Sequence, residues 1–280
     1  MGYDLRLRPR DGVLTEARFV EAFETRTHWS LPEEDVAAYA NPATAVSFHV
    51  THVPPAVVEP TGALVFSINF HRHRGFVLEA DLVLRELVDE LDLAVEDVQT
   101  DGIVGDDYDS DAFLRGWSLG NRAAYAAAGA DPEVEPPLTY PGEMIERVWR
   151  WNHEREATEA EHGGYYLARL VGFALAEGRV QTFTEWRLGA NVLLPRAELV
   201  AIRRDQTSGA VVPWDRVAGA IELRDDDRVD EPLDYWALLD AVVAPKASML
   251  VQPREPGAEL TMLDPGEIHA IEDVTPRRAG

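Results

Sequence analysis

The sequence contains no cysteine, which excludes disulfide bonds, thiolate nucleophiles and cysteine-ligated metal sites. Lys246 is its only lysine, so we do not expect Schiff-base chemistry or a phosphate-binding P-loop, both of which use a lysine. No apolar run approaches the roughly 20 residues that a membrane-spanning helix needs. The first residues also lack the basic start and apolar stretch of a secretory signal. We therefore expect a cytoplasmic protein with no membrane partner.

Acidic residues are abundant and unevenly placed. The 280 residues include 50 Asp and Glu against 26 Lys and Arg, which gives a net charge of -24. The segment from Gly75 to Leu114 holds thirteen carboxylates and one arginine, and so carries half of that charge. Acid concentrated in one segment creates a local negative potential that attracts a basic partner or a cation. A pI near 4.6 argues against direct nucleic-acid binding, because phosphate binding requires cationic side chains.

The first 130 residues follow an order of elements that is typical of one fold class. Tyr3, Leu5 and Leu7 alternate with polar residues, which predicts a strand with one buried face. Thr15 is predicted to cap the first helix, and a Pro-containing loop is predicted before residue 45. The other predicted elements are strands at 45–52, 64–72 and 93–98 and helices at 16–25, 78–91 and 111–128. Strand, helix, strand, strand, helix and a closing strand resemble a ferredoxin-like βαββα(β) half. We expect residues 1–130 to form this α+β domain.

A Pro-rich segment follows at residues 129–142, where four prolines and two glycines predict a linker. We expect residues 141–280 to form a second mixed α+β domain. Its predicted elements are helices at 143–161, 213–221 and 234–243, a hairpin from strands 165–175 and 179–186, and strands near 192, 199–202, 249–251, 259–263 and 268–272.

Three of the eight histidines are predicted on the polar side of the strands at 45–52 and 64–72 or directly after them. His49, His71 and His73 would share the polar face of a sheet if the two strands pair. Such a cluster could hold a catalytic metal or supply a general acid and base to a phosphoester. A one-residue slip in register would separate them, and a solvated polar face explains the same pattern. These histidines are the candidate catalytic residues only if the protein is an enzyme.

Asp107, Asp109 and Asp111 have the first three spacings of a calcium-binding loop. The match ends there, because Ala112 and Ser118 replace the glycine and glutamate that such a loop requires. Capping of the following helix explains the same carboxylates more simply. We therefore predict neither a metal nor a cofactor.

The absence of any complete catalytic motif favours a binding protein over an enzyme. We expect an acidic surface that neutralises or docks a basic protein partner, as in immunity proteins or nucleic-acid mimics. The partner-binding residues predicted are Glu79, Glu86, Asp89, Glu90, Asp106, Asp107, Asp109 and Asp111. One alternative is a metal-assisted or histidine-dependent hydrolase of a phosphoester. Another is a structural or oligomerising protein whose acidity only reflects its environment.

Overall fold

A computed structural model describes residues 2–56, 60–98, 102–130, 142–161, 166–174, 180–187, 192–203 and 209–215. The chain is of mixed α+β class, with four helices and a large antiparallel sheet among these residues. It divides into two compact units, and the division falls between Ile145 and Glu146. None of the described helices is both long enough and apolar enough to cross a membrane.

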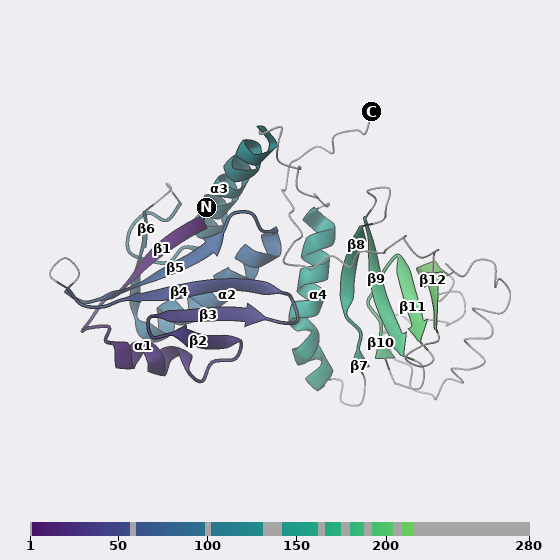
Figure 1. Cartoon of the computed structure of the whole chain (residues 1–280), viewed down its shortest axis with the longest axis horizontal. Helices are drawn as coiled ribbons and strands as arrows, with labels where there is room; N and C mark the ends of the chain where they lie inside the picture. The colour runs from purple at the N-terminus through teal and green to yellow at the C-terminus, as the bar shows by residue number, and fades with distance from the viewer. Residues whose placement is uncertain are drawn as a thin grey trace. The chain divides into compact units, whose positions relative to one another are not determined.

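The first unit is built on a six-stranded sheet with the order β2-β3-β4-β5-β1-β6 (Figure 1), and all neighbouring strands are antiparallel. Its strands are β1 (Gly2–Pro9), β2 (Trp29–Glu33), β3 (Val36–Asn41), β4 (Val46–Val53), β5 (Ala63–Asn69) and β6 (Leu93–Asp97). Its helices are α1 (Glu16–Phe23), α2 (Arg74–Leu91) and α3 (Ser110–Ala130). The predicted strands β1, β4, β5 and β6 and all three helices are confirmed, with changes at their ends.

One face of this sheet forms the core, because apolar side chains alternate along the strands. Phe113 of α3 packs on it, with its ring 5.6 Å from Tyr3 and 6.0 Å from Phe66. Phe19 of α1 stacks on the His52 ring at 5.2 Å. The opposite face is more exposed, and its residues include Arg6, Ser47, His49, Thr51 and Ser67.

The hairpin of β2 and β3 was not predicted, because the Pro-containing segment before residue 45 was interpreted as a loop. Pro32 lies within β2 at the point where its register with β3 shifts between Ser30 and Glu33. Proline cannot donate a backbone hydrogen bond, but an edge strand tolerates it. Among the described strands, β2 pairs with β3 alone, so it lies at the edge of the sheet.

Helix α3 lies close to the turn that leads from β5 into α2. The Asn121 amide donates to the backbone oxygens of Phe70 at 2.5 Å and Arg72 at 3.2 Å. Gly120 makes this approach possible, since a Cβ built there would lie 2.0 Å from the Phe70 ring. The beginning of α2 is thereby fixed against the middle of α3.

In the second unit, the described sheet has the order β12-β11-β9-β8. Its strands are β8 (Leu170–Ala174), β9 (Val180–Arg187), β11 (Leu199–Arg203) and β12 (Gly209–Pro213); β7 (Tyr166–Leu167) pairs with β10 (Val192–Leu193). The predicted antiparallel pairing of β8 with β9 is confirmed. The helix predicted at 213–221 begins one residue later, because Pro213 ends β12 while Trp214 and Asp215 are helical; residues 216–221 lie outside the described residues.

Helix α4 (Gly142–Glu161) supports this unit through polar contacts. The Asn152 side chain bonds the backbone of Leu170 twice, at 2.7 and 3.1 Å, and the Trp151 indole donates to the Ala168 oxygen at 2.7 Å. Of the predicted linker, residues 129 and 130 end α3 and residue 142 begins α4, while 131–141 lie outside the described residues. The elements predicted at 234–243, 249–251, 259–263 and 268–272 also lie outside them.

Candidate functional site

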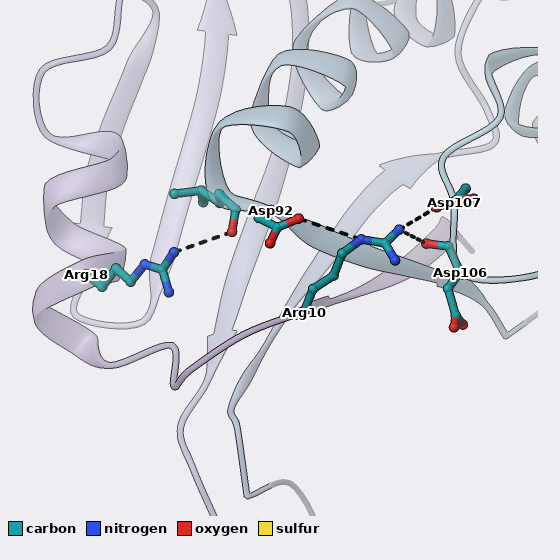
Figure 2. Close-up of polar contacts among 6 residues, drawn as sticks. Arg10, Arg18, Asp92, Asp106 and Asp107 are labelled. Carbon is teal, nitrogen blue, oxygen red and sulfur yellow. Dashed lines mark hydrogen bonds and ion pairs between the residues drawn. The ribbon is translucent and has the colours of Figure 1, made fainter.

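The end of α2 and the loop after β6, which both contain acidic residues, lie together at one edge of the first unit. The Arg10 guanidinium lies 3.7 Å from the Asp92 carboxylate and 2.6 Å from that of Asp107, and it donates to the Asp106 backbone oxygen at 2.8 Å (Figure 2). The backbone holds the same arrangement, since Arg10 donates to the Asp92 oxygen at 2.9 Å and Val95 to the Asp106 oxygen at 3.0 Å. We call Asp89, Glu90, Asp92, Asp106 and Asp107 the acidic edge.

Cations from the start of the chain partly compensate this edge. Helix α2 has no basic residue in its last turn, where its dipole favours one. Arg18 of α1 donates to the Leu91 carbonyl at 3.4 Å (Figure 2), and Arg26 pairs with Glu90. The Asp107 side chain is nevertheless 96% exposed. Water screens such an exposed pair, so it contributes at most about 1 kcal/mol.

The loop that carries Asp106 and Asp107 is anchored to the protein interior. The Tyr108 hydroxyl donates to the buried Asp81 carboxylate at 2.9 Å, and Arg85 donates to the same carboxylate at 2.5 Å. Burial, followed by the nearby Asp81 charge, raises the pKa of Tyr108 well above its ordinary value. The exposed carboxylates are therefore presented on a fixed support.

Glu79 is a correction to the predicted surface. It is fully buried, and its Oε1 accepts hydrogen bonds from the Tyr39 hydroxyl at 2.8 Å and the Asn41 amide at 2.7 Å. Burial and the adjacent Glu79 raise the pKa of Tyr39. Glu79 holds α2 against β3 and cannot contact a partner of the folded protein.

The other predicted partner-binding residues are exposed, namely Glu86, Asp89, Glu90, Asp106, Asp107, Asp109 and Asp111. They do not all share one environment. Asp109 caps α3, because its carboxylate accepts a bond from the Ala112 N–H at 3.0 Å. Asp111 lines a groove between α2 and α3. Asp107 instead pairs with Arg10. The three aspartates that have the spacing of a calcium-binding loop therefore each contact different residues.

The three candidate histidines occupy different settings. His49 is exposed on β4, opposite Ser67. The predicted strand 64–72 ends early, at Asn69, whose side chain accepts the His71 N–H at 2.8 Å and so forms a turn. The prediction that His71 and His73 share a strand with Asn69 is wrong for that reason.

Each of these two histidines instead packs near a helix. The His71 ring lies 5.4 Å from that of Tyr125 in α3. His73 is 3% exposed and caps α2, with its Nδ1 accepting the Gly75 N–H at 3.1 Å. Within the described part of the chain, no three His, Asp or Glu side chains are placed to hold a metal ion.

The buried position of Glu79 could be predicted from the sequence, whereas the contacts of Arg10 could not. Glu79 lies three residues after Phe76 and beside Ala80, both buried, so the helical period alone places it on the apolar stripe of α2. The contacts of Arg10 join residues more than 80 positions apart and have no local signal. No protein-family model, curated protein or solved structure matches the chain, so its function is argued from its own residues.

Proposed function

We propose that the protein is an acidic binding protein whose acidic edge docks a basic macromolecular partner. The observation that carries this proposal is the position of Arg10 between Asp92 and Asp107, which brings the end of α2 and the loop after β6 to one place. Immunity proteins and nucleic-acid mimics are the functional classes that such an edge fits.

The physical argument rests on exposed charge held by a fixed support. Carboxylates on such an edge raise the association rate of a basic partner by steering it and align it once it arrives. Because Asp107 is almost fully exposed in its ion pair with Arg10, a partner's arginine or lysine could replace Arg10 there at little cost. The proposal includes a cytoplasmic location for the protein.

The proposal extends to the fold of the first unit, which we regard as a ferredoxin-like core with an added hairpin. Support comes from the order β4-β5-β1-β6 with antiparallel neighbours, which corresponds to the strands expected from the sequence. The hairpin of β2 and β3 extends that sheet beside β4.

The test is a charge reversal at exposed positions that do not cap a helix. We would immobilise the full chain and its Asp89→Lys, Asp106→Lys, Asp107→Lys variant and capture proteins from a lysate of the native cell at low and high salt. A basic protein should bind the wild type, dissociate as salt rises and bind the variant at least tenfold more weakly. Asp109 is kept, because its loss would remove the cap of α3.

A matched control carries the same charge change on the other unit. Glu154, Glu156 and Glu161 are exposed on α4, and their replacement by lysine should leave capture unchanged. Equal loss in both variants would mean that only net charge matters and would overturn the proposal. Failure of the wild type to retain any basic protein at low salt would do the same.

A further inference from the structure

A groove of about 420 Å³ lies between α2 and α3, within the first unit. Its volume is in the range of small-molecule sites, which is roughly 300–1,000 Å³. The Asn121 amide fixes its two walls relative to each other, because it bonds α3 to the turn before α2. Asp111, Leu114, Arg115 and Leu119 of α3 line the groove and follow the helical period, so they belong to one stripe of that helix.

Two opposite charges of this stripe lie one helical turn apart. Asp111 and Arg115 are exposed, and among the described residues neither side chain has a hydrogen bond or an ion pair. Arg74 and Arg122 also line the groove, but both already interact with other groups. Asp111 and Arg115 are therefore the charged groups that a ligand can bind here without breaking an existing contact.

The separation of these two charges contrasts with two other helical pairs that have the same spacing. In α2, Arg85 pairs with Asp81 at 2.5 Å, and in α4, Arg150 pairs with Glu146. An acidic residue four positions from an arginine favours such a pair on a helix surface. In the groove the pair is not formed, so the carboxylate keeps its capacity to accept hydrogen bonds and the guanidinium its capacity to donate them.

Apolar side chains line the groove beside these charges. Val77 of α2 and Leu114 and Leu119 of α3 provide them, and Leu119 is 62% exposed. An exposed leucine alone needs no explanation, but here it continues an apolar wall. The ligand that fits this lining has a positive and a negative group close together and an apolar body.

We propose that the groove between α2 and α3 binds an α-amino acid with an aliphatic side chain. The ammonium group of the ligand donates to the Asp111 carboxylate, and its carboxylate accepts the paired hydrogen bonds of the Arg115 guanidinium. Its side chain lies against Val77, Leu114 and Leu119. Since the ligand has no net charge, the charge of -24 on the chain does not repel it. This site is separate from the acidic edge and does not depend on the function proposed for it.

Calorimetric titration of the full chain with L-leucine tests this proposal. For so small a ligand we expect a dissociation constant of about 0.1–1 mM. Asp111→Asn and Arg115→Gln should each bind leucine at least tenfold more weakly, since each variant loses a charged hydrogen bond. Leu119→Ser should weaken binding about threefold through its lost apolar contact. The three replaced side chains are exposed, so the circular dichroism of the variants should match that of the wild type.

Leucine analogues assign the two charged contacts. N-acetyl-leucine lacks the ammonium group, and leucinamide lacks the carboxylate, so the wild type should bind each at least tenfold more weakly than leucine. Asp111→Asn should bind N-acetyl-leucine as the wild type does, because the contact that this variant loses is already missing. For the same reason, Arg115→Gln should bind leucinamide as the wild type does. Glycine, which lacks the apolar body, should also bind at least tenfold more weakly than leucine.

A matched control uses the ion pair of the same spacing in the other unit. Glu146→Gln and Arg150→Gln should each bind leucine like the wild type, because these two residues pair with each other on α4. The proposal is overturned if leucine does not bind, if Asp111→Asn or Arg115→Gln binds it unchanged, or if glycine or N-acetyl-leucine binds equally well.

Discussion

The two ends of helix α2 are surrounded by charges of opposite sign. Arg74, Arg115 and Arg122 lie around its beginning, and Asp89, Glu90 and Asp92 lie at its end. The helix has 18 residues, which corresponds to about 27 Å. At both ends the local charge is the one that the helix dipole disfavours. These charges therefore do not stabilise α2 as an isolated helix. Groups of opposite charge from other elements would be favoured near each end.

The two ends differ in how other elements compensate them. At the acidic edge, three arginines from the start of the chain contact α2 or the adjoining loop: Arg10, Arg18 and Arg26. In the groove between α2 and α3, Arg74, Arg115 and Arg122 share the lining with one carboxylate, that of Asp111. The acidic edge is thus a network of ion pairs at the surface, whereas the groove between α2 and α3 places three arginines beside apolar side chains.

The largest expected effect comes from breaking the support that both ends share. Glu79→Ala leaves the Tyr39 hydroxyl and the Asn41 amide without their buried acceptor. Unsatisfied buried groups cost about 1–3 kcal/mol each, so we expect a loss of about 3 kcal/mol in the free energy of unfolding. Urea unfolding followed by tryptophan fluorescence measures it.

Glu79→Gln is the control for this substitution, because it keeps an oxygen that can accept from both donors. Its loss should be clearly smaller than that of Glu79→Ala. Equal losses would mean that the hydrogen bonds to Tyr39 and Asn41 do not hold α2 in place.

A smaller effect distinguishes the two ends by alkaline titration. Burial raises the pKa of both Tyr108, beside Asp81, and Tyr125, near the arginine end. The folded protein therefore keeps these protons at pH values where the unfolded chain has lost them. Stability is fully present below about pH 10 and should fall above it by about 1.4 kcal/mol per pH unit for each tyrosine.

Replacing each tyrosine with phenylalanine shows how much that tyrosine contributes to the loss of stability at alkaline pH. Asp81 raises the pKa of Tyr108 further, whereas Arg72 lowers that of Tyr125, so Tyr125 should ionise first. Urea unfolding between pH 9 and pH 11 should show a shallower alkaline slope for both Tyr108→Phe and Tyr125→Phe. An unchanged slope in both would contradict the raised pKa values.

Much of the first unit could be predicted from local patterns. Alternation of apolar residues identified β1, β4 and β5, and the helical period identified α2 and α3. The β2–β3 hairpin was missed because Pro32 is typical of loops and only its edge position makes it acceptable in a strand. That omission also hid the partners of Glu79, since Tyr39 and Asn41 belong to β3. The specific ferredoxin-like arrangement stays a prediction.

The site was less predictable, because it depends on contacts between distant residues. The charge count indicated an acidic segment, but it did not distinguish the buried Glu79 and Asp81 from the exposed Asp89 and Asp107. For the histidines, the alternating pattern continued past Asn69, where a side-chain hydrogen bond ends the strand. Nothing local indicated that arginines of α2 and α3 would line one groove.

The smallest expected effect concerns the bridge across the acidic edge. Arg10→Gln removes the cation between Asp92 and Asp107, and exposed ion pairs contribute at most about 1 kcal/mol. We expect a loss of about 0.5 kcal/mol at low salt that added salt largely restores, because screening reduces the repulsion left among the carboxylates. Arg8→Gln is the matched control, since Arg8, two residues earlier in β1, pairs with Glu96 at 2.7 Å and its side chain is similarly exposed. Equal losses and equal salt responses would show that Arg10 does not join the two acidic segments. If the basic partner also binds Arg10→Gln faster than wild type, the internal arginine and the partner compete for the same carboxylates.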